Sequence, residues 1–174
     1  MYTEYQPSHL LVPYIDSYWE FKGNPDYGMR IHILPDGCTD FIFTLGEVAN
    51  AVEEGSLIMQ PYRSYFVGPM TKYSELVTYT ESIHMFGVRF LPCGLSCFTN
   101  LPLHEFVNSR VSTNEMKAVF DDTFIEKLGE QKHVTDRIRV VEEYLLAYLA
   151  RHYQPADSPV SYTHLRAHET GRNL

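Results

Sequence analysis

Hydrophobic positions in the first half of the chain recur in short runs separated by residues typical of turns. These runs are residues 29–34, 39–45, 56–59, 64–67, 75–79 and 83–90. Short strands that follow one another at intervals of about 8–12 residues are typical of a small sandwich or barrel. We therefore expect residues 1–99 to form a β-rich part, built as a small antiparallel β-barrel or sandwich.

The turn between the first two of these runs is Pro35-Asp36-Gly37. Proline presets φ for a tight turn and glycine supplies a positive φ. The tripeptide therefore predicts either a β-hairpin or a sharp corner between two strands.

The hydrophobic spacing becomes helical after Pro92. Leu103, Phe106 and Val107 predict a first short helix, and a capping box (Ser112 with Glu115) precedes a second apolar face. That face comprises Met116, Val119, Phe120, Phe124 and Leu128, with Gly129 as the expected stop. A last helix is expected over residues 135–152. The chain is thus predicted to be α+β, with a helical segment of two to three helices over residues 100–157 in the same domain.

The apolar stripe of the last helix permits two interpretations. It consists of Ile138, Val141, Leu145 and Leu149, with further apolar residues beside it. Such a stripe either pairs two copies of the chain or covers the chain's own sheet. We keep both interpretations and take the four residues as candidates for dimerisation.

Composition and charge narrow the function. The chain has 174 residues and a formal net charge of −8, which argues against nucleic-acid binding by this chain alone, since such binding needs a basic surface. Its three cysteines show no CxxC pair, and neither a signal peptide nor a membrane span is visible. We expect a cytoplasmic protein with reduced thiols that does not engage a membrane.

Enzymatic or metal chemistry has weak support in the sequence. No nucleophile elbow, phosphate-binding loop or zinc-protease motif occurs, so we expect no catalytic residues, no metal and no cofactor. The rival hypothesis is a stand-alone β-barrel enzyme or metal-binding protein, which would use His32, Cys38, Asp40 and His84, with Asp36 as a further possible ligand.

The sequence favours small-molecule binding, because a small β-barrel can enclose one ligand. Such a pocket needs aromatic walls and a few placed polar groups. The candidate ligand-binding residues are Trp19, His32, Asp36, Asp40 and Arg89. Arg89 meets an anionic ligand group in this interpretation, or pairs with Asp36 or Asp40 in the alternative one.

Five stretches of the chain resemble the N-terminal sensor region of AraC-type bacterial transcriptional regulators. They are residues 11–19, the turn 33–43, the F-V-G-P run 66–69, residues 86–95 and the L-P-L-H-E-F run 101–106. The resemblance covers about residues 8–153. It departs from the family at Cys93, where a glycine is usual.

The resemblance implies a cupin-like sensor that binds a small effector, joined to a helical part that pairs two chains. In this family DNA is read by a C-terminal helix-turn-helix domain, and nothing in residues 158–174 resembles a recognition helix. Those residues, ending in SYTHLRAHETGRNL, look like adapter read-through joined to a truncated gene. We therefore expect a non-native or disordered tail there, and DNA contact only through a missing domain.

Overall fold

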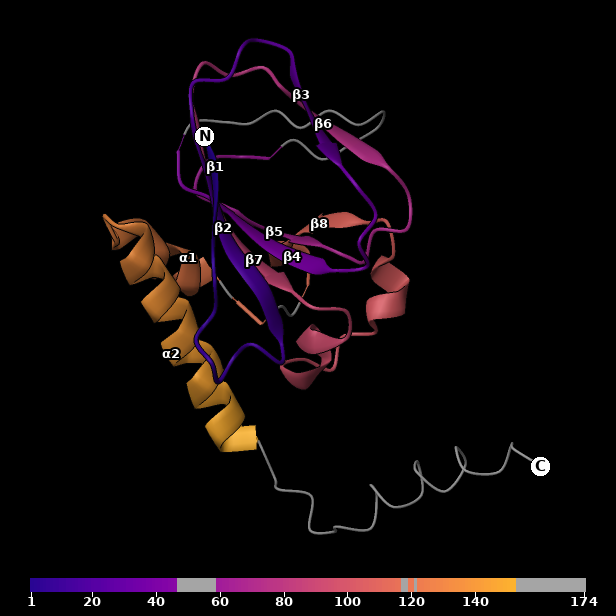
Figure 1. Cartoon of the computed structure of the whole chain (residues 1–174), viewed down its shortest axis with the longest axis vertical. Helices are drawn as coiled ribbons and strands as arrows, with labels where there is room; N and C mark the ends of the chain where they lie inside the picture. The colour runs from indigo at the N-terminus through magenta and orange to yellow at the C-terminus, as the bar shows by residue number, and fades with distance from the viewer. Residues whose placement is uncertain (47–58, 117–118, 121, 153–174) are drawn as a thin grey trace, which may run out of the picture.

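In a computed structural model, residues 1–46, 59–116, 119–120 and 122–152 are described. This part of the chain forms eight strands and two α-helices (Figure 1). The strands are β1 (Tyr2–Tyr5), β2 (Ile15–Gly23), β3 (Met29–Ile33), β4 (Thr39–Thr44), β5 (Ser64–Val67), β6 (Ser74–Thr78), β7 (Ile83–Phe90) and β8 (Arg110–Ser112). The helices are α1 (Asp122–Glu130) and α2 (Val134–His152), and short 3₁₀ turns occupy Gly94–Cys97, Leu103–Phe106 and Thr113–Glu115.

The strands form two antiparallel sheets. The larger sheet has the order β1-β2-β7-β4-β5-β8, and the smaller one pairs β3 with β6. The predicted α+β class with an antiparallel sheet is thus confirmed. Of the two expected forms, barrel or sandwich, a closed barrel is not found within the described ranges, because the edge strands β1 and β8 of the large sheet do not pair with the small sheet.

The turn at residues 35–37 is a corner between the two sheets and not a hairpin. β3 pairs with β6, whereas β4 pairs with β5 and β7. Gly37 has a φ of +71°, which glycine adopts without strain, and the Asp36 carboxylate accepts a hydrogen bond from the Cys38 backbone N–H at 2.9 Å. The corner carries the chain from the small sheet into the centre of the large one.

The two faces of the large sheet have different neighbours. One face packs against the helices, and the other faces β3 and β6 (Figure 1). The core on the helix side is dominated by fully or almost fully buried aromatic rings: Tyr18, Phe41, Phe43, Phe66, Phe86, Phe90, Phe98, Phe120 and Phe124. The helices and the sheet therefore share one hydrophobic core.

A buried arginine joins α2 to both the sheet and the end of α1. The Arg137 guanidinium is 3.2 Å from Glu20 Oε1, and it donates to the backbone carbonyls of Leu128 and Gln131 at 3.2 and 2.6 Å. His84 lies 2.8 Å from the same Glu20 oxygen. Burial lowers the pKa of His84, with Glu20 opposing the shift, so the imidazole is neutral near pH 7.

The helices differ from their predicted limits at several points. Ser112 ends strand β8, and its side chain makes no cap hydrogen bond. The α-helix begins at Asp122 and continues past Gly129 to Glu130, so the capping box and the glycine stop are wrong. Pairing of β8 with β5 overrides the local capping signal. Leu103–Phe106 is a 3₁₀ turn, so the described residues after position 100 form two α-helices and no third one.

Helix α2 uses its apolar stripe within the chain itself. Val141 and Leu145 are fully buried, and Ile138 and Leu149 are half-buried against the same core. The first two positions therefore cover the chain's own sheet, the second interpretation given above. No described helix combines the length and the apolar character that crossing a membrane requires. The predicted tail, residues 158–174, lies outside the described residues.

Candidate functional site, a cavity between the two sheets

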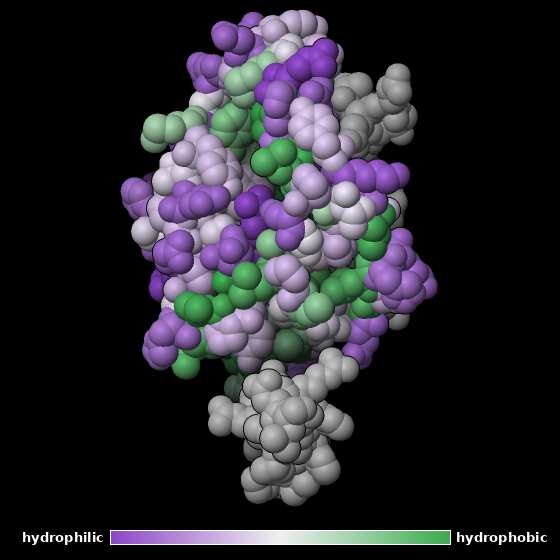
Figure 2. All heavy atoms as spheres, turned by 45° about the vertical axis from the view of Figure 1, so that its right-hand side comes forward, coloured by the Kyte–Doolittle hydropathy of each residue, from purple (hydrophilic) through white to green (hydrophobic). Residues whose placement is uncertain are grey.

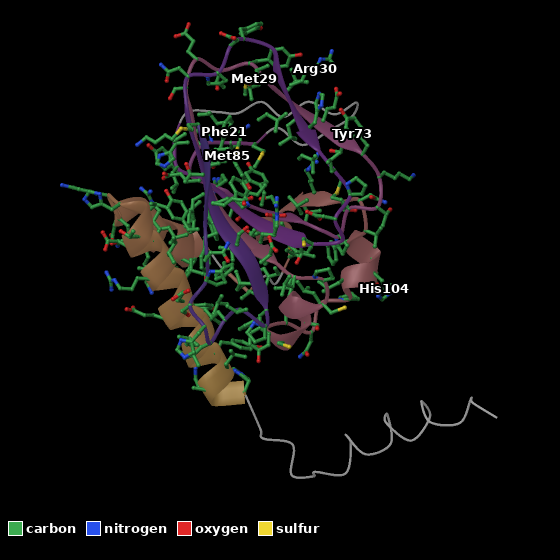
Figure 3. All side chains as sticks on the ribbon, viewed as in Figure 1. Phe21, Met29, Arg30, Tyr73, Met85 and His104 are labelled. Atoms are coloured by element: carbon green, nitrogen blue, oxygen red, sulfur yellow. The ribbon has the colours of Figure 1, made fainter. Side chains whose placement is uncertain are left out.

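A cavity of about 690 Å³ lies between the open face of the large sheet and the small β3–β6 sheet. Its walls are mostly apolar: Phe21, Met29, Ile31, Ile33, Leu34, Ile42, Val67, Met70, Leu76 and Met85. Figure 3 shows Phe21 and Met85 on the β2 and β7 side and Met29 toward β3. The volume and the lining fall in the range of small-molecule sites, which span about 300–1,000 Å³.

Strand alternation explains which side chains enter this cavity. On β2 and β7, Trp19, Phe21, Met85 and Arg89 point toward it, while their sequence neighbours pack on the helix side. The space-filling view in Figure 2 shows apolar side chains in green between hydrophilic ones in the half of the molecule that holds β3 and β6. The apolar wall therefore comes from residues two apart on neighbouring strands.

One end of the cavity is polar and centres on Asp40 of β4. Its Oδ1 accepts a hydrogen bond from Trp19 Nε1 at 2.8 Å and from Arg89 Nε at 3.3 Å. Burial raises the pKa of Asp40, although Arg89 and Trp19 pull it down. Burial alone would lower the pKa of Arg89, but the charge of Asp40 holds it above its usual value. The pair is thus a charged group with its own counterion inside an apolar site.

The place of Trp19 depends on Gly87 in the neighbouring strand. Trp19 and Gly87 are register partners of β2 and β7, and a Cβ at Gly87 would overlap the indole ring. The missing side chain lets the ring lie against the backbone of β7. In this position Nε1 reaches Asp40, so the glycine positions the aromatic wall of the polar end.

Two more carboxylates line the same end of the cavity. Glu4 of β1 accepts a hydrogen bond from the Tyr2 hydroxyl at 2.7 Å and lies 4.0 Å from the Arg89 guanidinium. Burial and the hydrogen bond to Glu4 raise the pKa of Tyr2, which keeps the phenol neutral. Asp36 lies at the corner that precedes β4 and also lines the cavity.

The five predicted ligand-binding residues all line this cavity. Trp19, Asp36, Asp40 and Arg89 belong to its polar end. His32 differs, because its side chain is 59% exposed, packs edge-on against the Tyr73 ring and lies 3.5 Å from Glu75 Oε1. His32 therefore stands at the rim and not among the polar groups within the cavity.

The four residues of the rival hypothesis do not all lie at one site, although His32 lines the rim of the cavity. Cys38 and Asp40 line the cavity, but His84 is on the helix side of the sheet with Glu20. Within the described ranges, no group of three or more His, Cys, Asp or Glu side chains could hold a metal ion. Burial raises the pKa of Cys38 to about 11, so its thiol is protonated at neutral pH and is a poor nucleophile.

The sequence did not single out several residues of the site. Tyr2 and Glu4 come from β1, which pairs with β2 but has too short an alternation to be recognised in the sequence. Met85 could have been found, because it alternates with Arg89 along one predicted strand. Met70 lies outside any strand and carries no periodic signal.

Comparison with known proteins gives a family but no function. The family model described as a domain of unknown function (DUF6597) matches residues 3–112, more than half of the chain. The match runs through β8 and includes every residue that lines the cavity except Tyr2. No curated protein matches the chain significantly. With its cavity inside the matched region, the chain belongs to the DUF6597 family.

Proposed function

We propose that this chain is the effector-sensing and dimerisation domain of an AraC-type transcriptional regulator, and that its effector binds between the two sheets. The observation that carries the proposal is the cavity itself, with apolar walls and one polar end formed by Asp40, Arg89 and Trp19. A few fixed polar groups in an apolar cavity orient a small ligand.

The stretches that resemble the regulator family also build this site. The turn at residues 33–43 contributes Asp36 and Asp40, and residues 86–95 contribute Arg89. Residues 11–19 end at Trp19. The resemblance therefore concerns the parts of the chain that form the cavity, which supports a sensing role for it.

The fold offers a direct connection between the cavity and the helices. On β2, Trp19 faces the cavity, and the next residue, Glu20, faces the opposite side and contacts Arg137 of α2. A ligand that shifts β2 would therefore also move Glu20, which holds α2 through Arg137. An effector changes the arrangement of the helices only if it binds one arrangement more tightly than the other.

Pairing of two chains and DNA contact through a helix-turn-helix domain stay predictions that rest on the resemblance. Because Val141 and Leu145 are committed to the chain's own core, a dimer contact on α2 must use other positions, such as the half-buried Ile138 and Leu149. We further propose a binding role and not a catalytic one, since the Cys38 thiol is protonated.

Ligand binding can be followed through Trp19, because it is the single tryptophan of the chain and lines the cavity. We expect at least one member of a panel of sugars, organic acids, alcohols and amines to shift the Trp19 emission and raise the melting temperature. The double variant D40N/R89Q, which removes the buried ion pair of the polar end, is expected to weaken binding of that ligand by about tenfold or more.

The matched control is R139Q/E143Q, which removes an exposed arginine–carboxylate pair (3.1 Å) on α2. It is expected to bind like the unmodified protein. The proposal fails if no panel member changes the Trp19 emission or the melting temperature, or if both double variants weaken the ligand equally.

A further inference from the structure

We infer that the cavity between the two sheets takes an amphipathic monocation, an apolar or aromatic body that carries one protonated amine. The inference rests on the proposed function and names the chemical class of its ligand. It is carried by the charges at the polar end, by the aromatic rings beside them and by the apolar walls of the rest of the cavity.

The polar end has more carboxylates than cations. Glu4, Asp36 and Asp40 line it, and Arg89 is the cation that they share. The other arginine of the lining, Arg30, is 66% exposed and pairs with Glu75 at 2.8 Å. After Asp40 and Arg89 neutralise each other, the carboxylates of Glu4 and Asp36 leave a negative potential toward the ligand.

An anionic ligand is disfavoured by the same arrangement. Arg89 already contacts Asp40 through Nε at 3.3 and 3.4 Å and approaches Glu4. A ligand carboxylate would have to replace one of these contacts and would stand near the carboxylates of Glu4 and Asp36, whose like charge repels it. A ligand ammonium instead supplies the charge that this end lacks.

Aromatic side chains add a second attraction for a cation. Tyr2 and Trp19 both line the cavity, and their rings lie 5.9 Å apart with an angle of 33° between their planes. Aromatic faces attract ammonium groups, by about 0.5–1 kcal/mol at exposed sites and more where water is excluded. The remaining wall includes Met29, Met70 and Met85, whose flexible side chains adapt to apolar bodies of different shape.

The test compares three probes with one body and different head groups: phenylbutylamine, phenylbutanol and phenylbutyrate. Calorimetric titration of the whole chain is expected to give the amine an affinity about tenfold or more above that of the alcohol, and the carboxylate the weakest binding. In E4Q, the preference for the amine over the alcohol is expected to fall by about threefold or more. D36N serves as a second, independent variant.

The matched control is E81Q, which removes the same charge from an exposed position outside the cavity lining. It is expected to keep the full preference for the amine. Equal or tighter binding of the alcohol or the carboxylate overturns the inference while the proposed function stands, as does a preference that both E4Q and D36N leave intact. Failure of all three probes, together with failure of the wider panel, instead overturns the proposed function.

Discussion

At the scale of single residues, the position of Trp19 in the site depends on a glycine, Gly87, in the neighbouring strand. Gly87 leaves room for the Trp19 indole, whose Nε1 then donates to Asp40 at 2.8 Å. Asp40 in turn holds Arg89. One backbone position on β7 thereby determines the geometry of a buried ion pair and of the aromatic wall beside it. The arrangement of Trp19, Asp40 and Arg89 therefore depends on the packing of Trp19 against Gly87 as well as on the ion pair.

We expect G87A to destabilise the protein by about 1–3 kcal/mol, because the new methyl group displaces the indole in a well-packed site. The Trp19 emission should shift at the same time, since its hydrogen bond to Asp40 is lost. Chemical denaturation followed by fluorescence measures both effects.

The control is G129A, made at a helical position of α1 where a Cβ meets no atom within 4 Å. This variant should be about 0.5–1 kcal/mol more stable than the parent, because alanine favours the helix. A G87A protein with unchanged stability and emission would show that Trp19 does not depend on the glycine.

At the scale of elements, α2 is attached to the rest of the molecule by a mixture of apolar and ionic contacts. Val141 and Leu145 fill the core, and Arg137 bridges Glu20 of β2 and the last carbonyls of the α1 region. The hydrophobic contacts hold the helix on the sheet. The arginine sets its position along the sheet, because its donors have fixed directions.

We expect R137M to lower the free energy of unfolding by about 3 kcal/mol, since the Glu20 carboxylate loses its cationic partner and keeps its contact with His84. The two backbone carbonyls near the end of α1 each lose one donor as well. Urea denaturation measures the loss. The exposed neighbour Arg139 provides the control, and R139M should change stability by less than about 0.5 kcal/mol. Equal effects of the two variants would contradict a special role for Arg137.

At the scale of the whole molecule, the sheet and the helices cannot be separated without exposing a large aromatic face. The DUF6597 match ends at residue 112, with β8, and leaves out both α-helices. Yet Phe41, Phe43 and Phe86 of the matched part contact Phe120 or Phe124, or pack in the same core as Leu145. The shared hydrophobic core therefore extends beyond the region that the family model covers.

We predict that a chain of residues 1–152 unfolds in one cooperative transition, whereas a chain of residues 1–112 shows none and aggregates or binds a hydrophobic dye. Removal of the helices uncovers the aromatic core on one face of the sheet, and an exposed apolar face of that size is unstable in water. Calorimetry and dye binding compare the two chains. A cooperative transition in the shorter chain would show that the sheet folds without the helices.

The sequence alone determined several elements and the candidate site residues, because hydrophobic periodicity and residue chemistry are local properties. The alternation of residues 83–90 predicted β7, the spacing of residues 135–152 predicted α2 almost to its ends, and residue chemistry selected Trp19, Asp36, Asp40 and Arg89. Only the tertiary structure decided what non-local packing controls. Strand pairing decided that Pro35–Gly37 is a corner between two sheets and not a hairpin, and that Ser112 lies in a strand. The tertiary structure also showed that His32 lies at the rim of the cavity. His84 and Cys38 lie on opposite sides of the large sheet, so they cannot act together. Glu4 lies at the site because β1 pairs with β2, and strand pairing brings together residues that are far apart in the chain.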